Sequence, residues 1–130
     1  AVAFAVDWKK ALLFIFIPQQ VSLTTVLIFN YVQHVHADEQ SKINHSRNFV
    51  GWGLNAFLFN NGYHTVHHDA PGLHWSKTPE AHAKVAHTID PVLNEKSFVW
   101  YLLRVYVLSI FVPKFRTRSM RLARIARDGS

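Results

Sequence analysis

Residues 11–33, ALLFIFIPQQVSLTTVLIFNYVQ, contain no charged side chain. A helix needs about 20 apolar residues to cross a hydrocarbon core about 30 Å thick, so this run predicts a transmembrane helix. Pro18, Gln19 and Gln20 interrupt it with polar groups, which membranes tolerate where neighbouring helices satisfy them. The alternative is a buried helix of a soluble protein that breaks at Pro18.

The segment before this run predicts a turn between two helices. Residues 1–6 are apolar, and Asp7-Trp8-Lys9-Lys10 is a short polar break with an aromatic residue suited to a membrane interface. We therefore expect a tight membrane hairpin that leads into the long helix. The chain starts with AVAFAV, without an initiator Met or a recognisable signal peptide, so we expect it to be a segment of a longer protein.

Two candidate metal ligands lie at the end of the long run. Asn30 and His34 are four residues apart and share one face of a helix. His36 would lie about 200° around the helix from His34 and cannot join the same ligand set without a local unwinding of the helix. We take His34 as a ligand and Asn30 as a weaker candidate, since Asn30 is equally suited to bonding the backbone at the helix end.

The sequence NNGYHTVHH, residues 60–68, holds the densest cluster of histidines. A helix places His64, His67 and His68 on one face because they follow the i, i+3, i+4 spacing. Neutral imidazoles suit iron, zinc, copper and nickel, and packing three together is tolerated best around a cation. The cluster predicts a metal site, and the alternative is an ordinary group of surface histidines.

Three further helices are expected after His34. Ser46 is a candidate N-cap for a helix that starts near Arg47 and ends at 60–62, and Thr78-Pro79 starts a short helix. Asp90-Pro91 repeats that signature, for a helix that runs to Pro113. We expect residues 38–42 to form a solvated connector, and the two histidines of the short helix to be exposed or hydrogen-bonded: His82 and His87.

The last helix contains an apolar part, residues 98–112, that is too short to span a bilayer. We predict an interfacial helix whose Arg104 reaches toward headgroups. Six basic residues and one acidic residue follow Pro113, whereas residues 1–112 are nearly neutral. Such a tail suits anionic lipid headgroups better than nucleic acid here, and places the C-terminus and the metal residues on the cytoplasmic side.

These patterns predict an all-α membrane protein with one transmembrane helix, followed by cytoplasmic and interfacial helices that carry the histidine motifs. The expected parts are a hairpin end with its transmembrane helix (1–33), a metal-binding part (34–90), an interfacial helix (91–113) and a basic tail (114–130). The chain has no cysteine, so a metal must be held by nitrogen and oxygen ligands.

The order of the motifs resembles the C-terminal third of the membrane fatty acid desaturase family. Asn30 and His34 match its N-x-x-x-H motif, and Ser46-Arg47-Asn48 matches the step between motifs. Residues 62–68, GYHTVHH, with Pro71, match its final histidine box. The resemblance spans nearly the whole chain, and its motifs specify the superfamily far better than the substrate.

The resemblance implies a multi-pass membrane enzyme with a non-haem di-iron centre, O2 as oxidant, and a ferredoxin or cytochrome b5-type electron donor. The implied function is introduction of a double bond into an acyl lipid, with hydroxylases and carotenoid ketolases of the same superfamily as alternatives. The implied ligands are His34, His64, His67, His68 and Asn30. Two earlier histidine boxes of that family are absent from these residues, so we expect the chain alone to be inactive.

Two functions outside this superfamily compete with it. A membrane zinc protease needs a glutamate base among these histidines, and the residues there, Val66 and His67 included, contain no glutamate. A membrane-anchored module that binds metal or haem without catalysis needs only the histidines.

Overall fold

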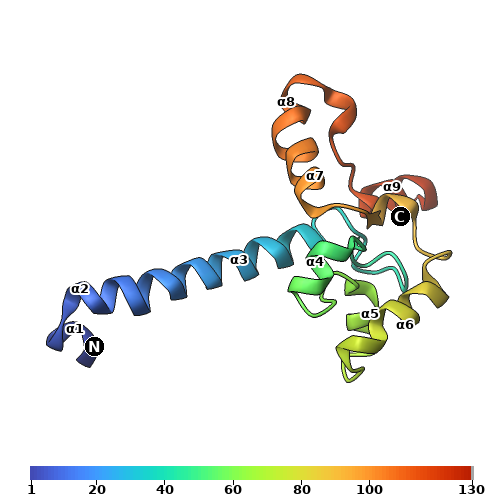
Figure 1. Ribbon diagram of the computed structural model, residues 1–130. Coiled ribbons are helices and arrows are strands. Elements are labelled where there is room, and N and C mark those ends of the chain that lie inside the picture. The colour runs from blue at the N-terminus through green and yellow to red at the C-terminus, as the bar shows by residue number, and fades with distance from the viewer. Residues whose placement is uncertain (130) are drawn as a thin grey trace. The chain divides into compact units, whose positions relative to one another are not determined.

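The computed structural model describes residues 1–129, which form two compact units, Ala1–Val32 and the chain from Gln33 onward. Both units are mostly helical (Figure 1). A parallel ladder of two residues on each side, β1 (Asn48–Phe49) with β2 (Asn94–Glu95), departs from the all-helical prediction.

The first unit is a helical hairpin with a long second arm. Helix α1 (Val2–Val6) is followed by α2 (Trp8–Ala11), the π-helical turn η1 (Leu12–Phe16) and α3 (Ile17–His34). Asp7 has extended backbone angles, and its carboxylate accepts a hydrogen bond from the Lys10 backbone at 3.0 Å. The rings of Phe4 and Phe16 pack edge to face at 6.4 Å, and the chain turns at Asp7, whereas residues 8–10 of the predicted break already belong to helix α2.

The helix from Trp8 to His34 is unbroken and has 27 residues, long and apolar enough to cross a membrane by length and composition. The predicted alternative, a break at Pro18, does not occur. The π-helical turn ends two residues before Pro18, and wider turns of this kind accommodate a residue that cannot donate to the helix ladder. Within the described residues only 6% of its most apolar window is buried.

The second unit packs short elements around a small core. Leu93 and Phe49 are fully buried, and the Phe49 ring lies edge to face against Phe98 and Tyr101. The elements that follow β1 and flank β2 are α4 (Trp52–Phe57), α5 (His64–Asp69), η2 (Trp75–Lys77), α6 (Thr78–Val85), η3 (Pro91–Leu93), α7 (Phe98–Leu102), η4 (Leu103–Leu108), α8 (Ser109–Phe111), η5 (Pro113–Phe115) and α9 (Met120–Asp128).

The helix predicted from Arg47 is wrong at its start. Residues 46–49 are extended and all buried, a pattern of a strand covered on both faces. Ser46 caps no helix, because its hydroxyl bonds the Thr65 hydroxyl at 3.0 Å. Helix α4 begins only at Trp52, after Gly51.

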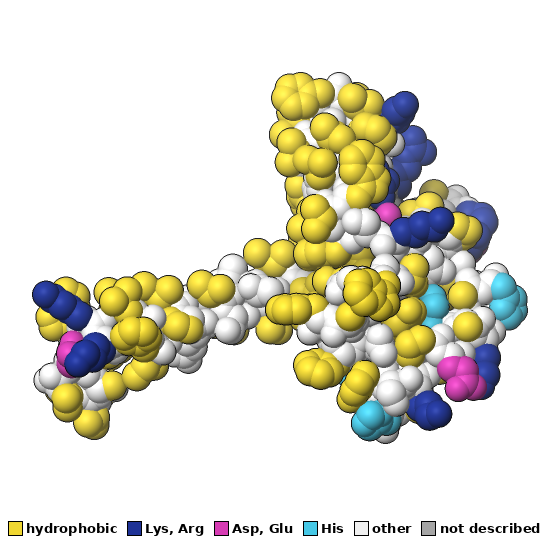
Figure 2. Space-filling model, viewed as in Figure 1, with side chains coloured by type: hydrophobic (Ala, Val, Ile, Leu, Met, Phe, Trp, Pro, Cys, Tyr) yellow, Lys and Arg dark blue, Asp and Glu magenta, His cyan; other side chains and the backbone are white. Residues whose placement is uncertain are grey.

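The helix predicted from Pro91 to Pro113 is also shorter than expected. Asp90 caps only the 3-10 turn η3, and a second N-cap, Ser97, starts the apolar helix that runs from Phe98 to Phe111. Arg104 does not reach outward: its guanidinium bonds the Glu95 carboxylate. Apolar side chains cover this helix (Figure 2). Among its residues, Val99, Ile110 and Phe111 are 74%, 67% and 78% exposed.

Three smaller expectations are corrected by contacts between distant residues. Asp38 in the supposedly solvated connector is 3% exposed and pairs with Arg124. Thr78 does not cap α6, since its hydroxyl donates to the Trp75 carbonyl, although Pro79 does lie in the first turn. His82 is buried, with its ring 5.1 Å from that of Tyr63, and within the described residues its Nδ1 has no hydrogen-bond partner.

Candidate metal centre

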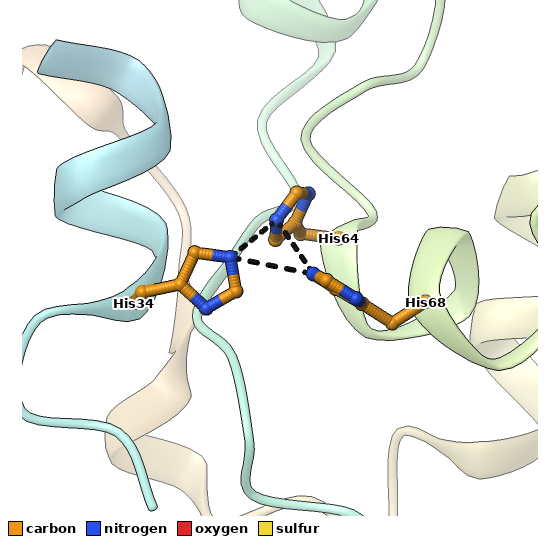
Figure 3. Close-up of side chains that lie close together, drawn as sticks. All are labelled: His34, His64 and His68. Atoms are coloured by element: carbon orange, nitrogen blue, oxygen red, sulfur yellow. Dashed lines mark hydrogen bonds between the residues drawn. The ribbon is translucent and has the colours of Figure 1, made fainter. Parts of the chain in front are cut away.

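Three imidazoles meet at one point of the second unit (Figure 3). His34 lies at the end of α3, and His64 and His68 lie one turn apart on α5. The Nε2 atoms of His34 and His64 are 3.0 Å apart, those of His64 and His68 are 3.1 Å apart, and those of His34 and His68 are 3.3 Å apart. The three side chains are brought together from segments 30 residues apart in the sequence.

These three short contacts cannot all be hydrogen bonds. In a neutral imidazole each ring nitrogen is either a donor or an acceptor. With three Nε2 atoms in a triangle, at least two have the same role, so at least one contact sets two donors or two acceptors against each other. A cation that accepts all three lone pairs removes this conflict.

The triangle has the size that a metal ion requires. Imidazole nitrogens bind first-row metal ions at about 2.1 Å, and two of them at right or tetrahedral angles then stand roughly 3.0 to 3.4 Å apart. All three observed separations fall in that interval. Three nitrogen ligands on one side also suit metals that keep open positions for substrate.

Burial keeps these rings in the neutral form that binds metal. Burial, together with the neighbouring His68 and His34, lowers the pKa of His64 to about 3. The pKa of His68 is also lowered, first by burial and then by His34 and His45. At neutral pH both rings therefore offer a lone pair, which is the state that metal coordination needs.

Buried amide side chains hold the start of α5. The Asn55 amide donates to the Phe49 carbonyl at 2.7 Å, and its oxygen accepts from the Gly62 backbone N–H at 3.0 Å. The oxygen of Asn48 accepts from the Thr65 backbone N–H at 2.9 Å. These bonds tie the residues on either side of His64 to β1 and to the end of α4.

The end of α3 is held by a second set of contacts. The side chain of Gln33 donates to the Asn61 carbonyl at 3.0 Å, which joins the His34 segment to the turn before α5. The Arg47 backbone donates to the Gln33 carbonyl at 2.6 Å, and its guanidinium donates to the Val35 carbonyl at 3.0 Å. Arg47 therefore forms hydrogen bonds with the backbone on both sides of His34.

The other histidine and asparagine candidates lie outside this group. His67 is exposed, and its ring stacks on His64 at 5.7 Å while it lines a different cavity with His74 and Trp75. Asn30 is exposed and belongs to the first unit, and its role stays a prediction. His36 turns away, as predicted, and its ring contacts the Thr117 hydroxyl.

One neighbour of the cluster was not expected from the sequence. The His45 ring lies 5.4 Å from that of His68, and its Nε2 is 3.3 Å from the Asp69 carboxylate. With His34, these residues line an open cavity of about 540 Å³ beside the cluster. His45 and His68 are 23 positions apart and are separated by β1 and α4, so no local spacing pointed to His45.

The family model for fatty acid desaturases matches residues 1–100, and the chain belongs to that family. No curated protein and no solved structure matches the chain. Members of the family are membrane-associated oxidoreductases whose catalysis depends on metal. The match includes the three converging histidines and ends in α7, before the basic tail.

Proposed function

We propose that this chain supplies half of a di-iron centre in an enzyme that uses O2 to introduce a double bond into a lipid acyl chain. The convergence of His34, His64 and His68 directly after a long apolar helix carries the proposal. Membership of the fatty acid desaturase family supports both the oxidative chemistry and the lipid substrate.

The ligand assignment follows from the donor set. His34, His64 and His68 would hold one iron, and His67, whose ring stacks on His64 outside the group of three, would serve the second, with Asn30 as a further ligand. Residues from the two earlier histidine boxes would complete the centre, since residues 1–130 do not contain them. When bound, the irons would supply the activation of O2 that removal of hydrogen from an unactivated methylene needs.

Other side chains of this chain would orient the metal ligands, and the ligand types would resist oxidation. The low pKa of His64 keeps its ring neutral, with one nitrogen lone pair free for a metal, and the Asn55 and Arg47 contacts fix the two segments that carry the ligands. The ligands are all nitrogen and oxygen groups, so no thiolate is exposed to an oxidant. A ferredoxin or cytochrome b5-type protein would deliver the electrons.

The same proposal places the enzyme in a bilayer. The helix Trp8–His34 would cross it, the apolar helix Phe98–Phe111 would lie at its cytoplasmic surface, and the metal residues would stand on that side. Two α9 arginines already pair with carboxylates of this chain: Arg121 with Glu39, and Arg124 with Asp38. The residues that would meet anionic headgroups are therefore those before α9, Lys114, Arg116 and Arg118, all of which are exposed.

The test uses the complete protein, with alanine at each proposed histidine ligand and at His87 as an exposed control. Iron content and new double bonds, measured by metal analysis and lipid mass spectrometry, should be lost in all four ligand variants and kept in the His87→Ala protein. Retained iron in the His67→Ala protein would refute the two-metal assignment. New hydroxyl groups instead of double bonds would show a hydroxylase, and unchanged lipids with iron and reductant supplied would refute lipid oxidation.

A further inference from the structure

The chain makes a strained turn immediately after His34. His36 has a φ of 63°, in the left-handed region that few residues other than glycine adopt. The turn closes with a hydrogen bond from the Ala37 backbone to the His34 carbonyl at 3.1 Å. A strained turn persists only where surrounding contacts hold it, so the groups that hold this one also set the direction of His34.

The C-terminal helix α9 holds the residues of this turn that follow His34. The Met120 backbone donates to the His36 carbonyl at 3.0 Å. The Arg124 guanidinium donates from Nε to Asp38 Oδ2 at 2.5 Å and from Nη2 to Gln40 Oε1 at 2.7 Å. One side chain thus bridges two residues of the segment that follows His34, from 86 positions further along the chain.

Asp38 depends on this partner. Its side chain is 5% exposed, and a carboxylate removed from water is tolerated only when it is paired and hydrogen-bonded. The hydrogen bond from Arg124 also lowers the pKa of Asp38, which keeps the carboxylate charged. Without Arg124, Asp38 would lose the partner that covers it, and Asp38 and Gln40 would lose their side-chain bonds to α9.

We propose that Arg124 is a positioning residue for the metal centre: by fixing Asp38 and Gln40 it fixes the turn that directs His34 toward His64 and His68. This inference rests on the metal centre proposed above. It assigns a role to a segment beyond the residues that match the family, because the match ends at residue 100 and α9 spans Met120–Asp128.

Arg47 and Arg124 hold the two ends of this turn. The Arg47 guanidinium donates to the Val35 carbonyl before His36, and the Arg124 guanidinium donates to the Asp38 carboxylate after it. Helix α9 is itself well delimited, since Ser119 caps its start and Gly129 ends it in a left-handed conformation with a φ of 71°. Its neighbour Arg127 is a matched control, because it lies on the same helix and bonds only the adjacent Asp128 among the contacts of the described residues.

The experiment titrates the complete protein in detergent micelles with Co²⁺, whose visible spectrum reports the number and geometry of its ligands. Replacing a group that orients a metal-binding histidine typically costs 10- to 100-fold in metal affinity, so Arg124→Ala should weaken Co²⁺ binding by about tenfold or more. Its spectrum should change as His34 leaves the ligand set. Arg127→Ala should match the unchanged chain in both respects.

The Arg124→Lys variant tests whether Arg124 positions His34 or only stabilises the fold. Lysine keeps the ion pair with Asp38 but cannot bridge to Gln40 at the same time, so Co²⁺ affinity and spectrum should recover in part. Wild-type affinity and spectrum in a folded Arg124→Ala protein would overturn the inference; if that variant does not fold, wild-type behaviour of Arg124→Lys would do so. An unchanged complete protein that binds no Co²⁺ would instead refute the metal centre, and the inference with it.

Discussion

Replacing Gly62 by alanine should destabilise the segment that presents His64. A Cβ atom at this position would lie 2.2 Å from the Phe49 carbonyl oxygen and 2.5 Å from Asn55 Oδ1, both far inside van der Waals contact. Neither group can move away without breaking hydrogen bonds. Phe49 belongs to β1, and Asn55 is 4% exposed and bonded on both sides of its amide.

The cost can be worked from the hydrogen bonds that such a shift breaks. Three bonds meet here: Gly62 N–H to Asn55 Oδ1 at 3.0 Å, Phe49 N–H to the Gly62 carbonyl at 2.8 Å, and the Asn55 amide to the Phe49 carbonyl at 2.7 Å. A buried polar group left without a partner costs about 1 to 3 kcal/mol. Loss of two of these bonds therefore predicts a destabilisation of about 2 to 6 kcal/mol, a large part of the stability of an ordinary domain.

Gly53→Ala is the matched control, because a Cβ there meets no atom within 4 Å and the residue lies inside α4. Alanine in a helix is favoured over glycine by about 0.5 to 1 kcal/mol, so this second substitution should stabilise the chain. Urea unfolding followed by circular dichroism measures both. A Gly62→Ala protein within about 0.5 kcal/mol of the unchanged chain would refute the reasoning, since the smallest predicted loss is about 2 kcal/mol.

Three other outcomes follow from the structure. The pKa of His64 is lowered from 6.5 to about 3, so between these pH values the unfolded chain binds a proton that the folded chain does not. Acid should therefore reduce the free energy of unfolding below pH 6.5, by at most about 1.4 kcal/mol per pH unit for this group. A His64→Leu chain should show a flatter pH dependence in urea unfolding. His82→Ala should cost about 1 to 3 kcal/mol because the ring is buried, contrary to the mild effect expected of an exposed histidine, and thermal unfolding would show it. Cysteines at the exposed positions Lys42 and Arg118 should both react with an impermeant maleimide from the cytoplasmic side, and labelling from opposite sides would mean that Phe98–Phe111 spans the bilayer.

Local periodicity accounts for what could be predicted. An uncharged run of 23 residues, 11–33, can satisfy its backbone only as a helix if it lies in lipid, and the structure has an unbroken helix there. His64 and His68 are four residues apart, so a helix brings their rings together whatever surrounds it. The pairing of His34 with this cluster was expected from the resemblance, and the structure brings the three rings together.

Contacts between distant residues account for the errors. Ser46 and Arg47 have the local signals of a helix start, but the next residue, Asn48, pairs with Asn94, which is 46 positions away and competes with any local helix. Backbone pairing and burial on both faces stabilise the extended form more than one N-cap hydroxyl stabilises a helix.

The sequence by itself determined the long apolar helix and the spacing of the histidines, because both depend on residues within a few turns of one another. Only the tertiary structure decided that His45 stands beside His68, that His82 is buried, and that Asp38 is bound by Arg124. Each of these depends on which segments pack together. The physical reason is that burial and ion pairing are properties of a position in space. Asp38 and Arg124 are 86 positions apart, so their contact produces no periodic pattern in the sequence.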